Sequence, residues 1–148
     1  MITSLGFVLA VILLLISALH MYWVCGGHWG ANAVIPAAFE NDSDSVERPL
    51  FRPGPLATIA VAVLLLMAAL ISLHAAGILR IIAADRLVRV AIWIIAGAFL
   101  LRGVGDFKYM GITKRVRNTR FAQMDSLLFT PLCLLLALLA FSIAIYST

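Results

Sequence analysis

Four long apolar segments constrain this chain more than any other feature. They cover approximately residues 3–23, 56–79, 87–104 and 125–146. A helix needs about 20 mostly apolar residues to cross the hydrocarbon core of a bilayer, and in lipid a segment must satisfy its own backbone hydrogen bonds. The sequence therefore predicts an all-α integral membrane protein, a four-transmembrane-helix bundle that forms a single domain over residues 1–148.

The composition supports the same class of protein. Of the 148 residues, 64% are hydrophobic and only 12% are charged, whereas soluble domains carry about 25% charged residues. The first apolar segment has no Lys or Arg before it, so it is predicted to be a retained helix and not a signal peptide. No segment resembles a nucleic-acid-binding module, and no nucleic acid is expected as a partner.

The number of crossings predicts the topology. Four spans put both termini on one side of the membrane, together with the connection at residues 80–86. The two longer connections, residues 24–55 and 105–124, then lie on the opposite side, here called the loop side. Within the first of these, residues 40–49 are polar and are expected to form a loop. Counting Lys and Arg places the loop side in the cytoplasm, and the reverse orientation stays an alternative.

The sequence offers two candidates for the first residue of the fourth span. Asp125 is one candidate, because an acidic residue is favoured at a helix N-terminus. Thr130 followed by Pro131 is the other, because Thr is a good N-cap and Pro suits the first helical position.

Arg102 and Asp106 are the first candidate site residues. They are four residues apart, so in a continuous helix they share one face and are expected to point inward. Ionisable residues at membrane depth indicate a functional site, although Arg102 lies near enough to the end of its span to reach the headgroups instead. Gly103 and Gly105 flank the pair and allow close approach of another helix or of a ligand.

Other polar residues share the depth of this pair. His20 and Asp125 are, with Asp106, the candidates for acid/base catalysis, because His titrates near neutral pH. For His20 the alternative is a hydrogen bond between helices, and for Asp125 a helix cap. The candidate ligand-binding residues are Tyr22, Trp23, Trp29, Arg102, Lys108, Lys114, Arg117 and Arg120.

The ligand-binding candidates also have simpler interpretations. The aromatic residues can form an interfacial belt. The basic residues can be solvated topology signals, can attract anionic lipid headgroups, or can grip a phosphate or carboxylate. His20, Cys25 and His28 have spacings that match no common zinc pattern, so neither a metal nor another cofactor is expected. Cys25 and Cys133 are predicted to be free thiols.

Three stretches carry a resemblance, namely "HMYWVCGGHWG", "RGVGDFKYMG" and "KRVRNTRFAQMD…TPLCL". Together they resemble the bacterial membrane proteins grouped as the domain of unknown function 3995 family. The resemblance implies these pattern positions: His20, Tyr22, Trp23, Gly26, Gly27, Trp29, Gly30, Arg102, Gly105, Asp106, Gly111, Lys114, Thr119, Phe121, Asp125 and Pro131. It implies no activity. The expected location is the bacterial cytoplasmic (inner) membrane.

Three functions fit these observations. The leading hypothesis is a protein that binds, or binds and modifies, a small anionic or amphipathic ligand such as a lipid headgroup. The second is a small oligomeric transporter or channel subunit, in which copies of the chain are partners. The third is an accessory membrane protein with a purely structural ion-pair cluster. The residues leave open whether the protein is an enzyme.

Overall fold

Four helices that are long and apolar enough to cross a membrane dominate the computed structural model, which describes residues 1–39, 47–51, 53–80, 85–106 and 108–146. They are α1 (Ile2–Val24), α3 (Pro55–Ala75), α4 (Asp85–Val104) and a continuous helical segment, Arg120–Tyr146. That segment consists of α5 (Arg120–Met124), a π-helical turn η1 (Asp125–Phe129) and α6 (Thr130–Tyr146). The predicted helical membrane fold is confirmed.

The described part of the connection between α1 and α3 on the loop side contains three short elements. They are helix α2 (Ala31–Val34) and a two-stranded antiparallel sheet of β1 (Ala37–Phe39) and β2 (Glu47–Pro49). The sheet is a small addition to the all-α prediction. Residues 40–46 of the predicted polar loop, and residues 81–84 of the connection between the second and third spans, lie outside the described residues.

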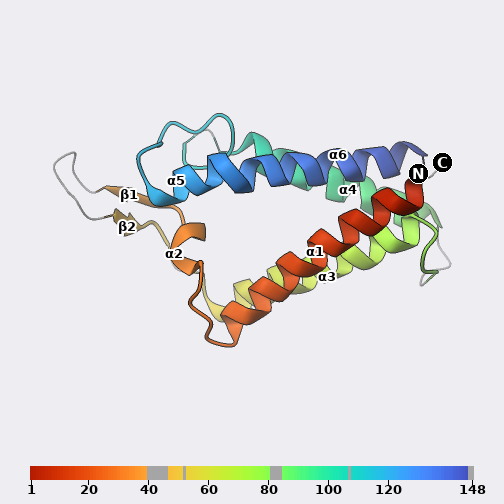
Figure 1. The fold of residues 1–148 in the computed structure, drawn as a ribbon, viewed down its shortest axis with the longest axis horizontal. Helices are drawn as coiled ribbons and strands as arrows, with labels where there is room; N and C mark the ends of the chain where they lie inside the picture. Colours follow the sequence, from red (N-terminus) through yellow and green to blue (C-terminus); the bar gives the residue numbers. More distant parts are fainter. Residues whose placement is uncertain (40–46, 52, 81–84, 107, 147–148) are drawn as a thin grey trace.

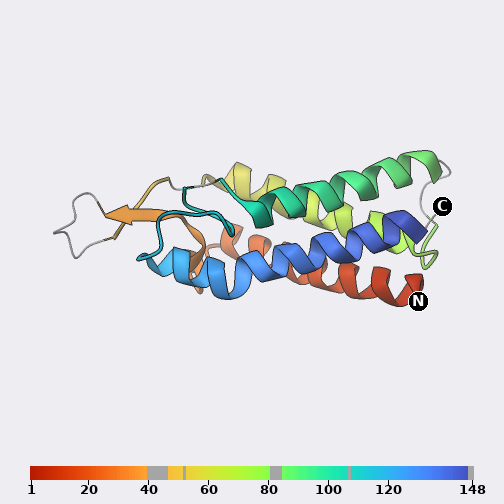
Figure 2. The same cartoon turned by 90° about the horizontal axis from the view of Figure 1, so that it is seen from above.

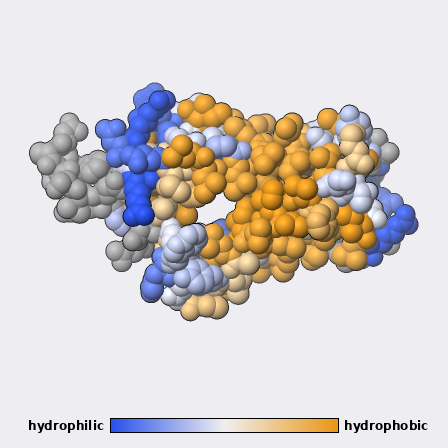
Figure 3. Space-filling model, in the orientation of Figure 1, coloured by the Kyte–Doolittle hydropathy of each residue, from blue (hydrophilic) through white to orange (hydrophobic). Residues whose placement is uncertain are grey.

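The long helices form two pairs, α1 with α3 and α4 with α6 (Figure 1). The pairs meet near the chain termini and diverge toward the loop side (Figure 1). The two termini lie at the same end of the bundle in both views (Figures 1 and 2). At the loop side α2 contacts α5 and so bridges the two pairs. The space-filling view shows a largely hydrophobic surface over the long helices and a hollow between the pairs (Figure 3).

The core between the helices is small and aliphatic. Leu9, Leu13, Ile92, Leu136 and Ile143 are fully buried there, whereas many other large apolar side chains on the same helices are exposed. Exposed apolar side chains are the expected surface of a helix that faces lipid, because lipid tails are as apolar as Leu.

Two helix boundaries differ from the prediction by more than two residues. The second span ends at Ala75 and not at residue 79, because Gly77 adopts a φ of +72° that terminates the helix, and its amide donates to the carbonyl oxygen of His74. The fourth span begins at Arg120 with Thr119 as its N-cap, so both candidate starts, Asp125 and Thr130, lie inside the helical segment.

We expect Gly6→Ala to destabilise the pairing of α1 and α3. Gly6 is buried, and a Cβ there would overlap the Cβ of Ala76 and lie 3.0 Å from the carbonyl oxygen of Ser72. Overpacking of this kind costs about 1–3 kcal/mol, which thermal unfolding in detergent would detect. Gly97→Ala is the control, because a Cβ added at Gly97 would have nothing within 4 Å, and it should be neutral or stabilising. Equal destabilisation by both variants would contradict this packing.

Candidate functional site

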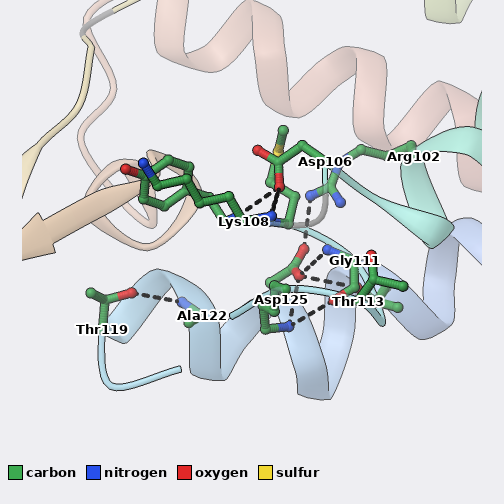
Figure 4. Close-up of polar contacts among 12 residues, drawn as sticks. Arg102, Asp106, Lys108, Gly111, Thr113, Thr119, Ala122 and Asp125 are labelled. Carbon is green, nitrogen blue, oxygen red and sulfur yellow. Dashed lines mark hydrogen bonds and ion pairs between the residues drawn. The ribbon is translucent and has the colours of Figure 1, made fainter. Parts of the chain in front are cut away.

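The carboxylate of Asp125 is the centre of a buried polar network (Figure 4). Its Oδ1 accepts a hydrogen bond of 2.8 Å from Arg102 Nη2. Its Oδ2 accepts from the Gly111 amide at 2.8 Å, from Lys114 Nζ at 2.9 Å and from Thr130 Oγ1 at 3.1 Å. Asp125 is fully buried and Lys114 is nearly so. One carboxylate thus joins α4, the loop after it and the fourth span.

The π-helical turn places Asp125 and Thr130 together. Pro131 has no backbone N–H, and its ring crowds the carbonyl group four residues earlier. The helical turn directly before Pro131 is a π-helical turn, in which each amide bonds five residues back and not four. The Thr130 amide therefore donates to the carbonyl oxygen of Asp125. Single π-helical turns of this kind are frequent at functional sites. The same spacing lets the Thr130 hydroxyl reach the Asp125 carboxylate.

Two glycines shape the loop that brings Gly111 and Lys114 to Asp125. Gly105 and Gly111 have φ angles of +92° and +81°. A Cβ on Gly105 would overlap the carbonyl oxygen of Met110, and one on Gly111 would overlap that of Val104. The chain therefore crosses itself backbone to backbone here, which only glycine permits. Gly103, by contrast, lies against Leu134 of α6, so it provides the predicted close approach to another helix.

The predicted pairing of Arg102 with Asp106 is wrong. Helix α4 ends at Val104, so the four-residue spacing does not put the two side chains on one helix face. Asp106 is exposed, and its Oδ1 accepts from the amides of Lys108, Tyr109 and Met110 at 3.0, 2.6 and 2.8 Å. Slight burial raises the pKa of Asp106, but these amide hydrogen bonds outweigh it and hold the pKa below its usual range.

The network carries more positive than negative charge. Arg102 and Lys114 both pair with Asp125, and the second terminal nitrogen of Arg102, Nη1, is buried without a hydrogen-bond partner within the described part of the chain. A cavity of about 260 Å³ adjoins the network. Its lining residues are Gly111, Ile112, Lys114, Arg117, Ser126 and Thr130.

His20 and the aromatic candidates belong to a different part of the loop side, at the end of α1. The His20 ring hydrogen-bonds through Nδ1 to the carbonyl oxygen of Ile16 at 2.8 Å and lies edge-on to Trp23. Trp23 Nε1 donates to the carbonyl oxygen of Trp29, and the Trp29 amide donates to the hydroxyl of Tyr22. These contacts define the aromatic turn, residues 20–30. No hydrogen bond or ion pair described for His20 reaches the Asp125 network.

The remaining basic candidates lie around the loop. Lys108 is exposed, with Nζ 5.0 Å from the centre of the Tyr109 ring. Arg117 lines the cavity, and Arg120 is the exposed first residue of α5. Cys25 and Cys133 are free thiols, as predicted. No three His, Cys, Asp or Glu side chains within the described ranges are grouped closely enough to hold a metal ion.

Three contributors to the site escape prediction from the sequence. Gly111 is predicted only as a position of the family pattern, and its amide gives no signal of its own, because every residue except proline has one. Thr130 resembles a helix cap, although its position five residues after Asp125 and directly before Pro131 is the signal for a π-helical turn. Ser126, which lines the cavity, could be noticed only as the neighbour of Asp125.

The chain belongs to the family described as "Protein of unknown function (DUF3995)", whose model matches residues 13–140. The resemblance inferred from the three stretches is confirmed. No curated protein and no solved structure matches the chain.

We expect Asp125→Asn to destabilise the protein by about 3 kcal/mol or more, because removing one partner of a buried ion pair leaves the other charges uncompensated. Thermal or chemical unfolding in detergent measures the change. The control is Asp85→Asn, since Asp85 is 90% exposed and lies 3.7 Å from His74, and exposed pairs contribute about 0–1 kcal/mol. Equal effects would show that the Asp125 network does not hold the loop side together.

The lowered pKa of Asp106 predicts that the stability of the protein depends on pH. Because its pKa is lowered in the folded state, its ionised form stabilises the fold above the unfolded pKa of about 3.9, and this contribution is lost as the pH falls below that value through the folded pKa. Asp106→Ala should therefore be less stable than the wild type at pH 7, with the difference shrinking toward pH 3. A difference that grew on acidification would refute this role.

Proposed function

We propose that this membrane protein binds an anionic amphiphile, with the charged headgroup in the cavity beside Asp125. The observation that carries the proposal is that this cavity is lined by Lys114 and Arg117 and adjoins a network with an excess of positive charge. The Nη1 of Arg102 also has no hydrogen-bond partner within the described chain, so hydrogen-bond donors exceed acceptors there.

The lengths of the spans support a headgroup at this place. The helical segment Arg120–Tyr146 has 27 residues, which corresponds to about 40 Å at about 1.5 Å per residue. The hydrocarbon core is about 30 Å thick, so the first two turns of the segment extend beyond it. These first turns carry the polar residues of the segment, Arg120, Gln123, Asp125 and Ser126, so we infer that this end, and not the apolar end at Tyr146, reaches the lipid headgroups.

The other candidate residues then take supporting roles. Lys108 and Arg120 add to a basic loop, in which each base near an anionic membrane surface contributes about 1 kcal/mol of attraction. Tyr22 and Trp29 are exposed on the aromatic turn and suit the membrane interface. We assign no reaction, because Asp125 is engaged by four donors and His20 lies outside the network.

A structural tether is the second candidate function. The observation that favours it is that the Asp125 carboxylate already has four donors within the chain. A transporter or channel has less support, because the described core of the bundle is apolar and its buried Ser17 and Ser72 donate to backbone carbonyl groups of Ala62 and Ala68.

We place the protein in the bacterial cytoplasmic membrane with the loop side inward. This orientation follows the bias of Lys and Arg toward the loop side, and it puts the cavity next to the anionic inner leaflet.

The binding test uses native mass spectrometry of the protein in mild detergent with phosphatidylglycerol and phosphatidylcholine of the same chain length. We expect the anionic lipid to be retained preferentially, and Arg117→Gln to reduce that preference several-fold, because Arg117 lines the cavity. Arg89→Gln, in α4 near the opposite end of the bundle, should leave it unchanged. An absent preference, with a stable fold, would favour the tether.

A further inference from the structure

We propose that the cavity between Lys114, Arg117 and Ser126 is selective for a phosphate monoester. This inference rests on the proposed function and deepens it by naming the chemical class of the headgroup. It excludes two groups with a single negative charge that a positively charged site would otherwise accept equally, the phosphate diester and the carboxylate.

The donors around the cavity match a group with several acceptor oxygens. Lys114 Nζ donates to the carbonyl oxygen of Gly111 at 3.3 Å and to Asp125 Oδ2 at 2.9 Å. An ammonium group has three hydrogens, so one remains. Arg117 adds a guanidinium with its fixed fork of donors, which suits phosphate, and Ser126 adds a hydroxyl group. Three residues with side-chain donors thus line one cavity.

The charge balance selects between kinds of phosphate. Lys114 and Arg117 line the cavity, and Arg102 lies beside it in the network, so three positive charges are close together. Among the described residues, Asp125 is the only carboxylate that pairs with Arg102 or Lys114, and none pairs with Arg117. The excess is therefore two positive charges. A phosphate monoester carries a charge of about −1.5 to −2 at pH 7, with a second pKa of about 6, whereas a diester carries one negative charge. Only the monoester neutralises the excess.

The size of the cavity agrees with a headgroup and not with a whole ligand. Pockets for drug-sized molecules measure about 300–1,000 Å³, and this one measures about 260 Å³. A phosphate fits with little attached to it, and the remainder of an amphiphile would extend along the lipid-facing surface of the helices.

The test is calorimetric titration of the intact protein in nonionic detergent with phosphatidic acid and phosphatidylglycerol of identical chains. At pH 7.5 we expect phosphatidic acid to bind roughly tenfold more tightly, the factor that a hydrogen bond to a charged group supplies. At pH 5.5 the advantage should fall to about twofold or less, because the monoester loses its second charge. Phosphatidylglycerol is the control for pH effects on the protein, because the charge of a phosphate diester stays the same between these two pH values. No histidine lines the cavity.

Substitutions inside and outside the cavity lining test whether the cavity causes the preference for phosphatidic acid. Arg117→Gln and Ser126→Ala should each remove most of the advantage of phosphatidic acid, and both side chains are exposed, so the fold should survive. Arg115→Gln removes a charge from the same loop outside the cavity lining and should preserve the advantage. Equal loss in all three variants would overturn the assignment to the cavity.

Competition with inorganic phosphate distinguishes the two sources of the phosphate group, and the comparison of the two lipids distinguishes this inference from the proposed function. Inorganic phosphate that displaces phosphatidic acid at millimolar concentration would identify a soluble phosphate as the ligand, and failure to displace it would identify a lipid; both support monoester chemistry. Equal binding of phosphatidic acid and phosphatidylglycerol overturns this inference and leaves the proposed function standing. Binding of neither lipid overturns both.

Discussion

The buried carboxylate of Asp125 is the interaction on which the loop side depends. It holds Arg102 at the end of α4, Gly111 and Lys114 in the following loop, and Thr130 in its own helical segment. Burying a carboxylate is costly unless charged partners and hydrogen bonds compensate it. Two cations and two neutral donors provide that compensation here. These ion pairs and hydrogen bonds join the loop after α4 to the fourth span.

The membrane fold could be predicted because it depends on a summed property of long segments. About 20 apolar residues cross a bilayer whatever their order, so errors at single positions do not matter. The partner of Arg102 could not be predicted in the same way. The spacing rule that pairs residues four apart holds only inside a continuous helix. Helix α4 ends at Val104, two residues before Asp106, where Gly105 adopts a positive φ. The correct partner, Asp125, is 23 residues away in the sequence.

The positions of the family pattern divide into two structural groups. The first is the aromatic turn, where Trp23 and Trp29 are joined by a hydrogen bond and the ring of Tyr22 lies against Gly27, so that a Cβ on Gly27 would overlap it. The second is the Asp125 network with the loop after α4. From the sequence alone both groups share one membrane depth and are expected to form one cluster. They belong instead to different helix pairs, which diverge at this end of the bundle (Figure 1).

The charge of the network bears on whether it is only a tether. A tether needs enough cations to neutralise its carboxylate, and one cation meets that need. Asp125 has two, and Arg102 also keeps a buried nitrogen without a partner in the described chain. The proposed anion beside Lys114 and Arg117 gives a reason for the second cation, which a tether does not need. The same arrangement can therefore hold the loop and still attract a phosphate group.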